Sequence, residues 1–145
     1  MKMDFTQYTH DHMVLALKRM YPQLTPGTDY RAAHPVQRNG GQSGQPFIAY
    51  WANSSVPRPQ DSEVHAYFAA NEETIRAEHV RIFRDMALRS TDSKTVAPPD
   101  APDSVKALAA GWVAYREALR KIPEQEGFPF SVAWPTAPDE GGTGT

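Results

Sequence analysis

The chain has 145 residues, of which 40% are hydrophobic, and its formal net charge is −2 at neutral pH. This length predicts about one domain, with one modest core or two small ones. A general nucleic-acid binder needs a basic face, and this charge balance does not indicate one. The sequence has no cysteine, which excludes disulfides, zinc–thiolate sites and thiol nucleophiles.

The sequence also lacks the signals of a membrane or secreted protein. No stretch approaches the ~20 consecutive apolar residues of a membrane span, and no apolar run follows Met1 as in a signal peptide. We therefore expect a protein that is made and folded in a reducing cytoplasm.

A short helix is predicted over residues 9–20. Met13, Leu17 and Met20 share one stripe at spacings of four and three. Thr9 is a suitable N-cap residue, and the Tyr-Pro pair directly after the helix ends it, because proline disfavours helical geometry in the preceding residue.

Two strands are predicted next, over residues 29–34 and 47–52. The second is rich in aromatic and β-branched side chains, and the glycine-rich segment 38–44 between them is typical of a turn. Because a lone hairpin is marginally stable in water, we expect this one to pack against a helix.

A long helix is predicted from a start signal at residues 56–63 to about Arg89. Pro59 suits its first turn, and a break near Asn71 is left open. Its apolar stripe consists of Val64, Phe68, Ile75, Ile82 and Met86.

Residues 91–103 contain three prolines and little to bury, which predicts a linker and the best domain boundary in the chain. The clearest helix follows over residues 104–122. We expect its stripe to be buried against another helix, either in this chain or in a second copy. The stripe consists of Val105, Leu108, Trp112, Tyr115, Leu119 and Ile122.

The predicted fold class is α+β: a short N-terminal helix, a small hairpin and a long helix, then a second helix and an extended proline-rich arm. The expected domain limits are 1–90 for a small α+β domain, 91–103 for the linker and 104–138 for the helix plus arm. Residues 139–145 are polar and rich in glycine, and we expect a disordered tail.

Candidate chemistry is sparse. His10 and His12 flank Asp11, but a solvated helix N-terminus is favoured over a metal site, since no further ligand is fixed by the sequence. His65 and His79 share a helix face about 21 Å apart, too far for one site. The glycine-rich loop lacks the lysine of a phosphate loop. No catalytic set, cofactor motif or metal signature is present, so we expect a protein that is not an enzyme and needs no cofactor.

Two stretches resemble known phage families. Residues 112–123, followed by Phe-Pro at 128–129 and Val-Ala-Trp-Pro at 132–135, resemble the tail assembly chaperone module of tailed phages, a W-x-x-Y-R-x-A-L-R helix followed by F-P and W-P. XkdW-type phage proteins resemble this chain over the segments 16–22, 29–30, 48–51 and 57–64, although the glycine-rich hairpin loop is longer here.

These resemblances imply a non-enzymatic phage or prophage tail-associated protein that binds tail or tail-fibre proteins during assembly. The alternatives are a minor virion subunit of the tail or neck and, less favoured, a small histidine-based enzyme. The implied location is the host bacterial cytoplasm or the virion tail, with self-association left open and no nucleic acid, membrane or small-molecule substrate. We expect partner contacts from Trp112, Tyr115, Arg116, Phe128, Phe130 and Trp134.

Overall fold

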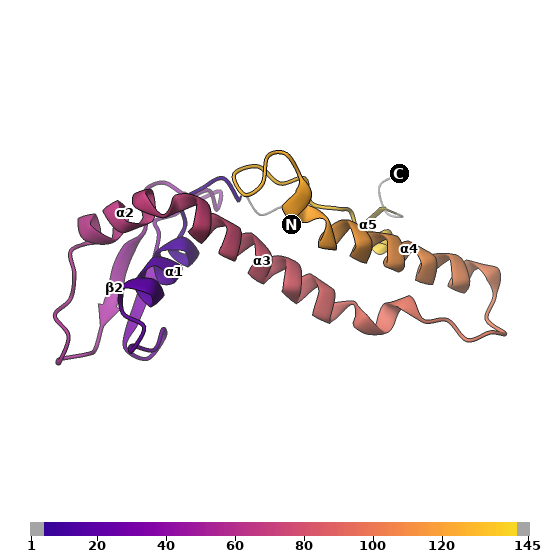
Figure 1. The fold of residues 1–145 in the computed structure, drawn as a ribbon, viewed down its shortest axis with the longest axis horizontal. Coiled ribbons are helices and arrows are strands. Elements are labelled where there is room, and N and C mark those ends of the chain that lie inside the picture. The colour runs from indigo at the N-terminus through magenta and orange to yellow at the C-terminus, as the bar shows by residue number, and fades with distance from the viewer. Residues whose placement is uncertain (1–4, 142–145) are drawn as a thin grey trace. The chain divides into compact units, whose positions relative to one another are not determined.

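The computed structural model describes residues 5–141 and confirms the α+β fold class (Figure 1). Its elements are α1 (His10–Met20), β1 (Tyr30–Ala33), β2 (Phe47–Trp51), α2 (Asp61–Ala70), α3 (Glu72–Ser90), the 3-10 turn η1 (Asp92–Thr95), α4 (Asp103–Arg120), the 3-10 turn η2 (Ile122–Glu124) and α5 (Pro138–Gly141). None of the helices in this described part is long and apolar enough to cross a membrane.

The chain forms two compact units, Met1–His79 and Val80–Thr145, so the division falls inside α3. The segment 91–103, which the sequence predicts as a linker, lies within the second unit as η1 and the turn before α4. The domain limits inferred from the sequence stay a prediction.

In the first unit, α1 lies within one residue of its predicted bounds. Thr9 is its N-cap in extended geometry, Asp11 lies in the first turn, and Lys18 and Arg19 lie in the last. These charges oppose the partial charges at the two helix ends. Tyr21 leaves helical geometry at φ −132°, before the proline, as predicted.

The two predicted strands pair antiparallel, with Tyr30 opposite Trp51. Polar groups near the start of α2 cover the outer edge of β2. The backbone N–H of Ile48 donates to Oδ1 of Asp61 at 2.9 Å, and Nη2 of Arg58 donates to the Ile48 carbonyl at 3.0 Å. An unpaired strand edge is a template for aggregation, so these two bonds also protect the hairpin.

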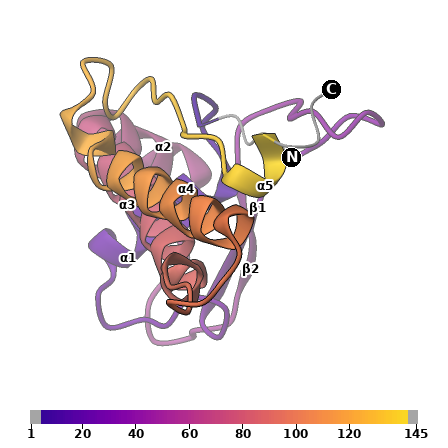
Figure 2. The same cartoon turned by 90° about the vertical axis from the view of Figure 1, so that its right-hand side faces the viewer.

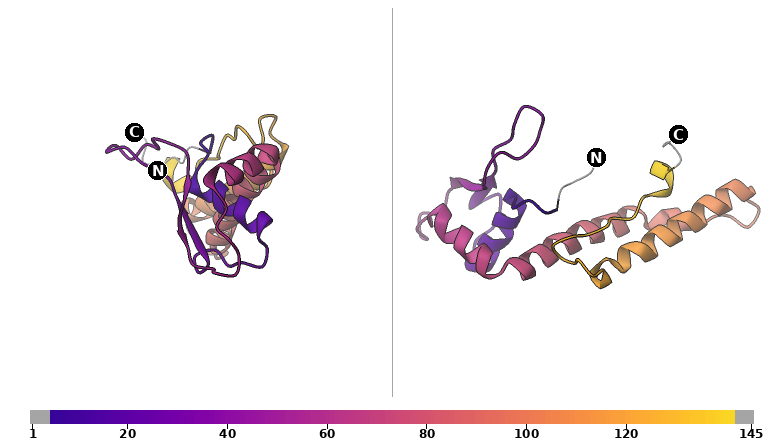
Figure 3. Two further views of the ribbon diagram at one scale, coloured as in Figure 1. Left: turned by 90° about the vertical axis from the view of Figure 1, so that its left-hand side faces the viewer. Right: turned by 90° about the horizontal axis from the view of Figure 1, so that it is seen from above.

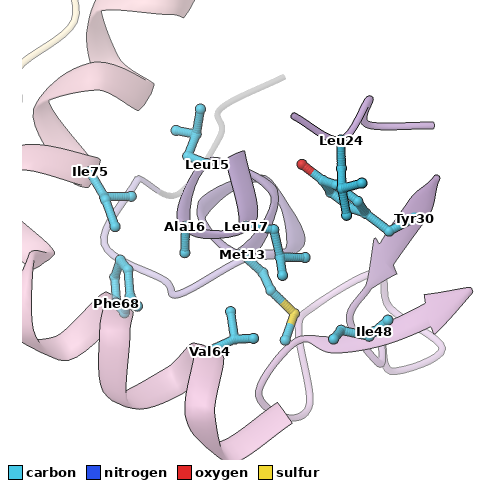
Figure 4. Close-up of a cluster of buried hydrophobic side chains, with 10 residues drawn as sticks. All are labelled: Met13, Leu15, Ala16, Leu17, Leu24, Tyr30, Ile48, Val64, Phe68 and Ile75. Atoms are coloured by element: carbon cyan, nitrogen blue, oxygen red, sulfur yellow. The ribbon is translucent and has the colours of Figure 1, made fainter. Parts of the chain in front are cut away.

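Helix α1 supplies the centre of the first unit's core (Figure 4). Side chains from α2, α3 and the hairpin surround it, which confirms that the hairpin packs against a helix. The core consists of Met13, Leu15, Ala16, Leu17, Leu24, Tyr30, Ile48, Val64, Phe68 and Ile75. The helix break is confirmed at Asn71, whose side-chain amide donates to the Tyr67 carbonyl at 2.9 Å.

In the second unit, the chain turns back after α3, and α4 runs antiparallel to the second half of α3 (Figures 1 and 3). Two residues of the predicted long-helix stripe, Ile82 and Met86, are exposed in this half of α3.

The prediction that the whole α4 stripe is buried is wrong at its N-terminal end. Leu119 and Ile122 are completely buried, but Val105 is 42% exposed and Leu108 is 49% exposed. The first half of α4 faces η1 and α5, which are short elements. Such neighbours supply too few side chains to close over two large apolar residues.

Helix α5 lies beside α4 (Figure 2), where the sequence predicts a disordered tail from residue 139. Pro138 packs on Gly111: a Cβ added at this glycine would lie 3.3 Å from the proline Cγ. The small residue in α4 therefore permits this close approach. The rest of the predicted tail, residues 142–145, lies outside the described residues.

Two leucines of α4 provide a matched test of this packing. Leu119→Ala should lower the free energy of unfolding by about 2–5 kcal/mol, because it empties a fully buried site. Leu108→Ala should cost about 0.5 kcal/mol or less, because its side chain is half-exposed. Urea unfolding of both variants measures the difference, and equal losses would contradict the burial described for α4.

Candidate functional site

An open apolar groove of about 330 Å³ lies over the first half of α4. One wall of the groove comes from η1 and Val96, and α4 supplies the other wall. The groove is lined by Lys94, Val96, Val105, Leu108, Ala109, Trp112 and Asp139. Val96 is 79% exposed, the largest exposure among the exposed large hydrophobic residues of the described chain. A cluster of exposed apolar side chains around a groove is typical of a binding surface.

The indole of Trp112 is a fixed part of this groove. The ammonium nitrogen of Lys94 lies 4.4 Å from the centre of a Trp112 ring, a cation–π contact. Tyr115 packs edge-on against the same side chain, with ring centres 5.5 Å apart. Because Trp112 is buried and contacts these two neighbours, its indole has little freedom to move within the groove.

Arg116 fastens the η1 wall to α4. Its Nη1 donates to the Leu88 carbonyl and, at 2.8 Å, to Oγ1 of Thr91, while Nη2 donates to Oδ1 of Asp92 at 2.6 Å. Thr91 Oγ1 in turn donates to the Ala87 carbonyl at 2.8 Å. One planar guanidinium thus holds the last turn of α3 and the start of η1 in place.

The residues after α4 fold back on themselves. Both ends of the Gln125 side-chain amide bond to the backbone of Ala133, each at 2.8 Å. The guanidinium of Arg81 lies 5.2 Å from the centre of the Phe128 ring. Phe130 is exposed, and Trp134 is half-buried.

The structure does not bring the six expected partner-binding residues to one place. Trp112 lines the groove and Tyr115 contacts Trp112, whereas Arg116 supports the groove wall. The other three, Phe128, Phe130 and Trp134, belong to the folded-back segment and do not line the groove.

Sequence reasoning missed four lining residues, one of which is Ala109 of α4. Lys94 and Val96 lie in the segment interpreted as a linker, and Asp139 lies in the segment interpreted as a tail. The available signal was Val96, a lone β-branched apolar residue between polar and proline-rich stretches. Leu108 and Val105 were noticed, but they were expected in the core.

The histidines of the first unit gather around α1. Nδ1 of His10 lies 2.9 Å from Nδ1 of His34, and Asp11 lies between His10 and His79, at 3.2 and 3.3 Å from their Nε2 atoms. Within residues 5–141, no group of three or more histidine, cysteine or acidic side chains is placed to hold a metal ion. The structure therefore offers no metal centre in its described part.

Comparison with known families gives two matches. Residues 77–139 match the family model described as phage tail assembly chaperone protein, and residues 13–76 match the one described as XkdW protein. Both resemblances seen in the sequence are thereby confirmed. No curated protein and no solved structure matches the chain. The two matched segments meet inside α3, close to the division between the two compact units.

The support that Arg116 gives to the groove wall can be tested by Arg116→Lys. Lysine cannot reproduce the fork of bonds, so we expect a loss of about 1–3 kcal/mol in unfolding free energy. Amide exchange should also accelerate in residues 91–96. Arg120→Lys, an exposed change on the same helix, is the control. Unchanged exchange in the Arg116 variant would show that the wall does not depend on this side chain.

Proposed function

We propose that this phage tail assembly chaperone-like chain binds an apolar segment of a phage tail or tail-fibre protein in the α4 groove during assembly, without catalysing a reaction. The observation that carries the proposal is the coincidence of two findings. The match to the phage tail assembly chaperone family covers residues 77–139, and all seven groove-lining residues lie within that range.

The chemistry of the groove favours an apolar occupant. Val96, Val105 and Leu108 are exposed in the chain alone, and fully burying one such side chain is worth about 1.5–3 kcal/mol. The volume of about 330 Å³ is at the small end of ligand pockets, which suits one or two side chains of a linear segment. Trp112 supplies a rigid aromatic surface of the kind enriched at interface hot spots.

We further propose that the remaining expected residues act around this groove. Tyr115 and Arg116 hold Trp112 and the η1 wall in position. Phe130, which is 48% exposed, offers a second apolar contact, and Phe128 and Trp134 shape the turn that presents it. Binding to the client in the host bacterial cytoplasm fits an assembly role. Mass spectrometry of purified particles distinguishes this role from that of a virion subunit, which would remain in the tail.

Two valines of α4 allow a closely matched test. Val105 lines the groove and Val113 does not, yet both are 42% exposed. Val105→Asp should leave the circular dichroism spectrum unchanged and reduce capture of tail or tail-fibre proteins at least tenfold, because it places a charge where an apolar side chain docks. Val113→Asp should capture as much as the unmodified protein. Equal capture by both variants would contradict a groove-based function.

A further inference from the structure

His12 is a completely buried histidine in the first turn of α1. Three rings surround it: Tyr8 from the preceding segment, Phe68 from α2 and His79 from α3, with ring centres 6.3, 5.6 and 4.3 Å away. Its position therefore lies where α1 meets α2 and α3.

The contacts of this imidazole require its neutral form. The backbone N–H of Thr9 donates to Nδ1 of His12 at 3.0 Å, so Nδ1 carries no proton. This bond belongs to a capping box in which His12 occupies the position that glutamate or glutamine usually takes. Nε2 then carries the single ring proton, and within residues 5–141 it has no hydrogen-bond partner.

The charged groups around His12 disfavour a second proton on its imidazole ring. From α3 it faces Arg76 and His79, and from its own helix it faces His10 and Asp11, while α2 contributes the apolar ring of Phe68. The only carboxylate in this set, that of Asp11, is directed at His10 and His79.

We propose that His12 is a proton-sensitive latch, whose protonation breaks the Thr9 cap and separates the first turn of α1 from α2 and α3 in mild acid. The added proton occupies Nδ1, where it opposes the N–H of Thr9. The resulting cation is buried beside Arg76 and His79. Separation of the helix turn from α2 and α3 exposes this cation to water, which removes the cost of burying it.

The direction of the pH dependence follows from the pKa of this side chain. Burial, together with His79 and Arg76, lowers the pKa of His12 to about 3, against about 6.5 for an unfolded chain. Between these values the unfolded state binds more protons than the folded state, so stability falls as pH decreases from 6.5. The pKa of Asp11 is also lowered, chiefly by its hydrogen bond from His79, and this contribution is lost only below about pH 4.

The matched experiment compares three proteins by urea unfolding between pH 7.5 and 5. In the unmodified chain, His12 alone should decrease the folding equilibrium constant about 30-fold over this range. His12→Gln keeps an acceptor for the Thr9 N–H but does not titrate, so most of this decrease should disappear. His65→Gln, at a histidine bonded through Nε2 to the Pro46 carbonyl, should retain it.

A second readout keeps the proposal testable if the His12 variant does not fold. Nitrogen NMR of the unmodified chain should show His12 as the neutral Nε2–H form while the helix turn is closed. The protection factors of the amides in residues 9–13, taken relative to the intrinsic exchange rate at each pH, should fall toward pH 5. A His12 ring that titrates near pH 6.5 while α1 stays protected would overturn the latch. Identical pH dependence in the unmodified and His12→Gln proteins would overturn it as well.

Discussion

The hydrogen bonds of the Arg116 guanidinium are the interaction on which the packing of the second unit depends. They join α4 to the end of α3 and to η1, and these elements provide the second unit with only a thin core. Because the neighbours of α4's first half are short, Val105 and Leu108 stay exposed beside a buried Trp112. The same arrangement that holds the unit together therefore leaves an apolar groove open, and the proposed binding function rests on this incomplete burial.

The two units bury their apolar side chains to different extents. In the first, α1 is surrounded by a hairpin, α2 and the start of α3, and its core side chains are closed from water. The close packing of this unit buries His12, and burial disfavours its protonated form. The second unit leaves several of its large apolar side chains exposed, among them Val96, Val105 and Leu108. The family matches follow nearly the same division, XkdW protein over residues 13–76 and phage tail assembly chaperone protein over residues 77–139.

Local signals in the sequence predicted the elements well. Thr9 and the Tyr-Pro pair set the limits of α1, and the aromatic run at residues 47–51 marked β2. The exposure of Leu108 was not predictable, because spacing along a helix identifies an apolar face but not what covers it. The contact between His79 and Asp11 was not predictable either, because these residues lie 68 positions apart and only the packing of α1 on α3 joins them.

Direct contact between the groove and a phage tail protein can be measured by site-specific crosslinking. A photoreactive amino acid is placed at position 108, inside the groove, or at position 113, on α4 outside it, and the protein is irradiated in phage-producing cells. We expect position 108 to crosslink to a tail or tail-fibre protein, identified by mass spectrometry, and position 113 to give no such crosslink. Crosslinking to such a protein from position 113 alone, or from neither position, would contradict it.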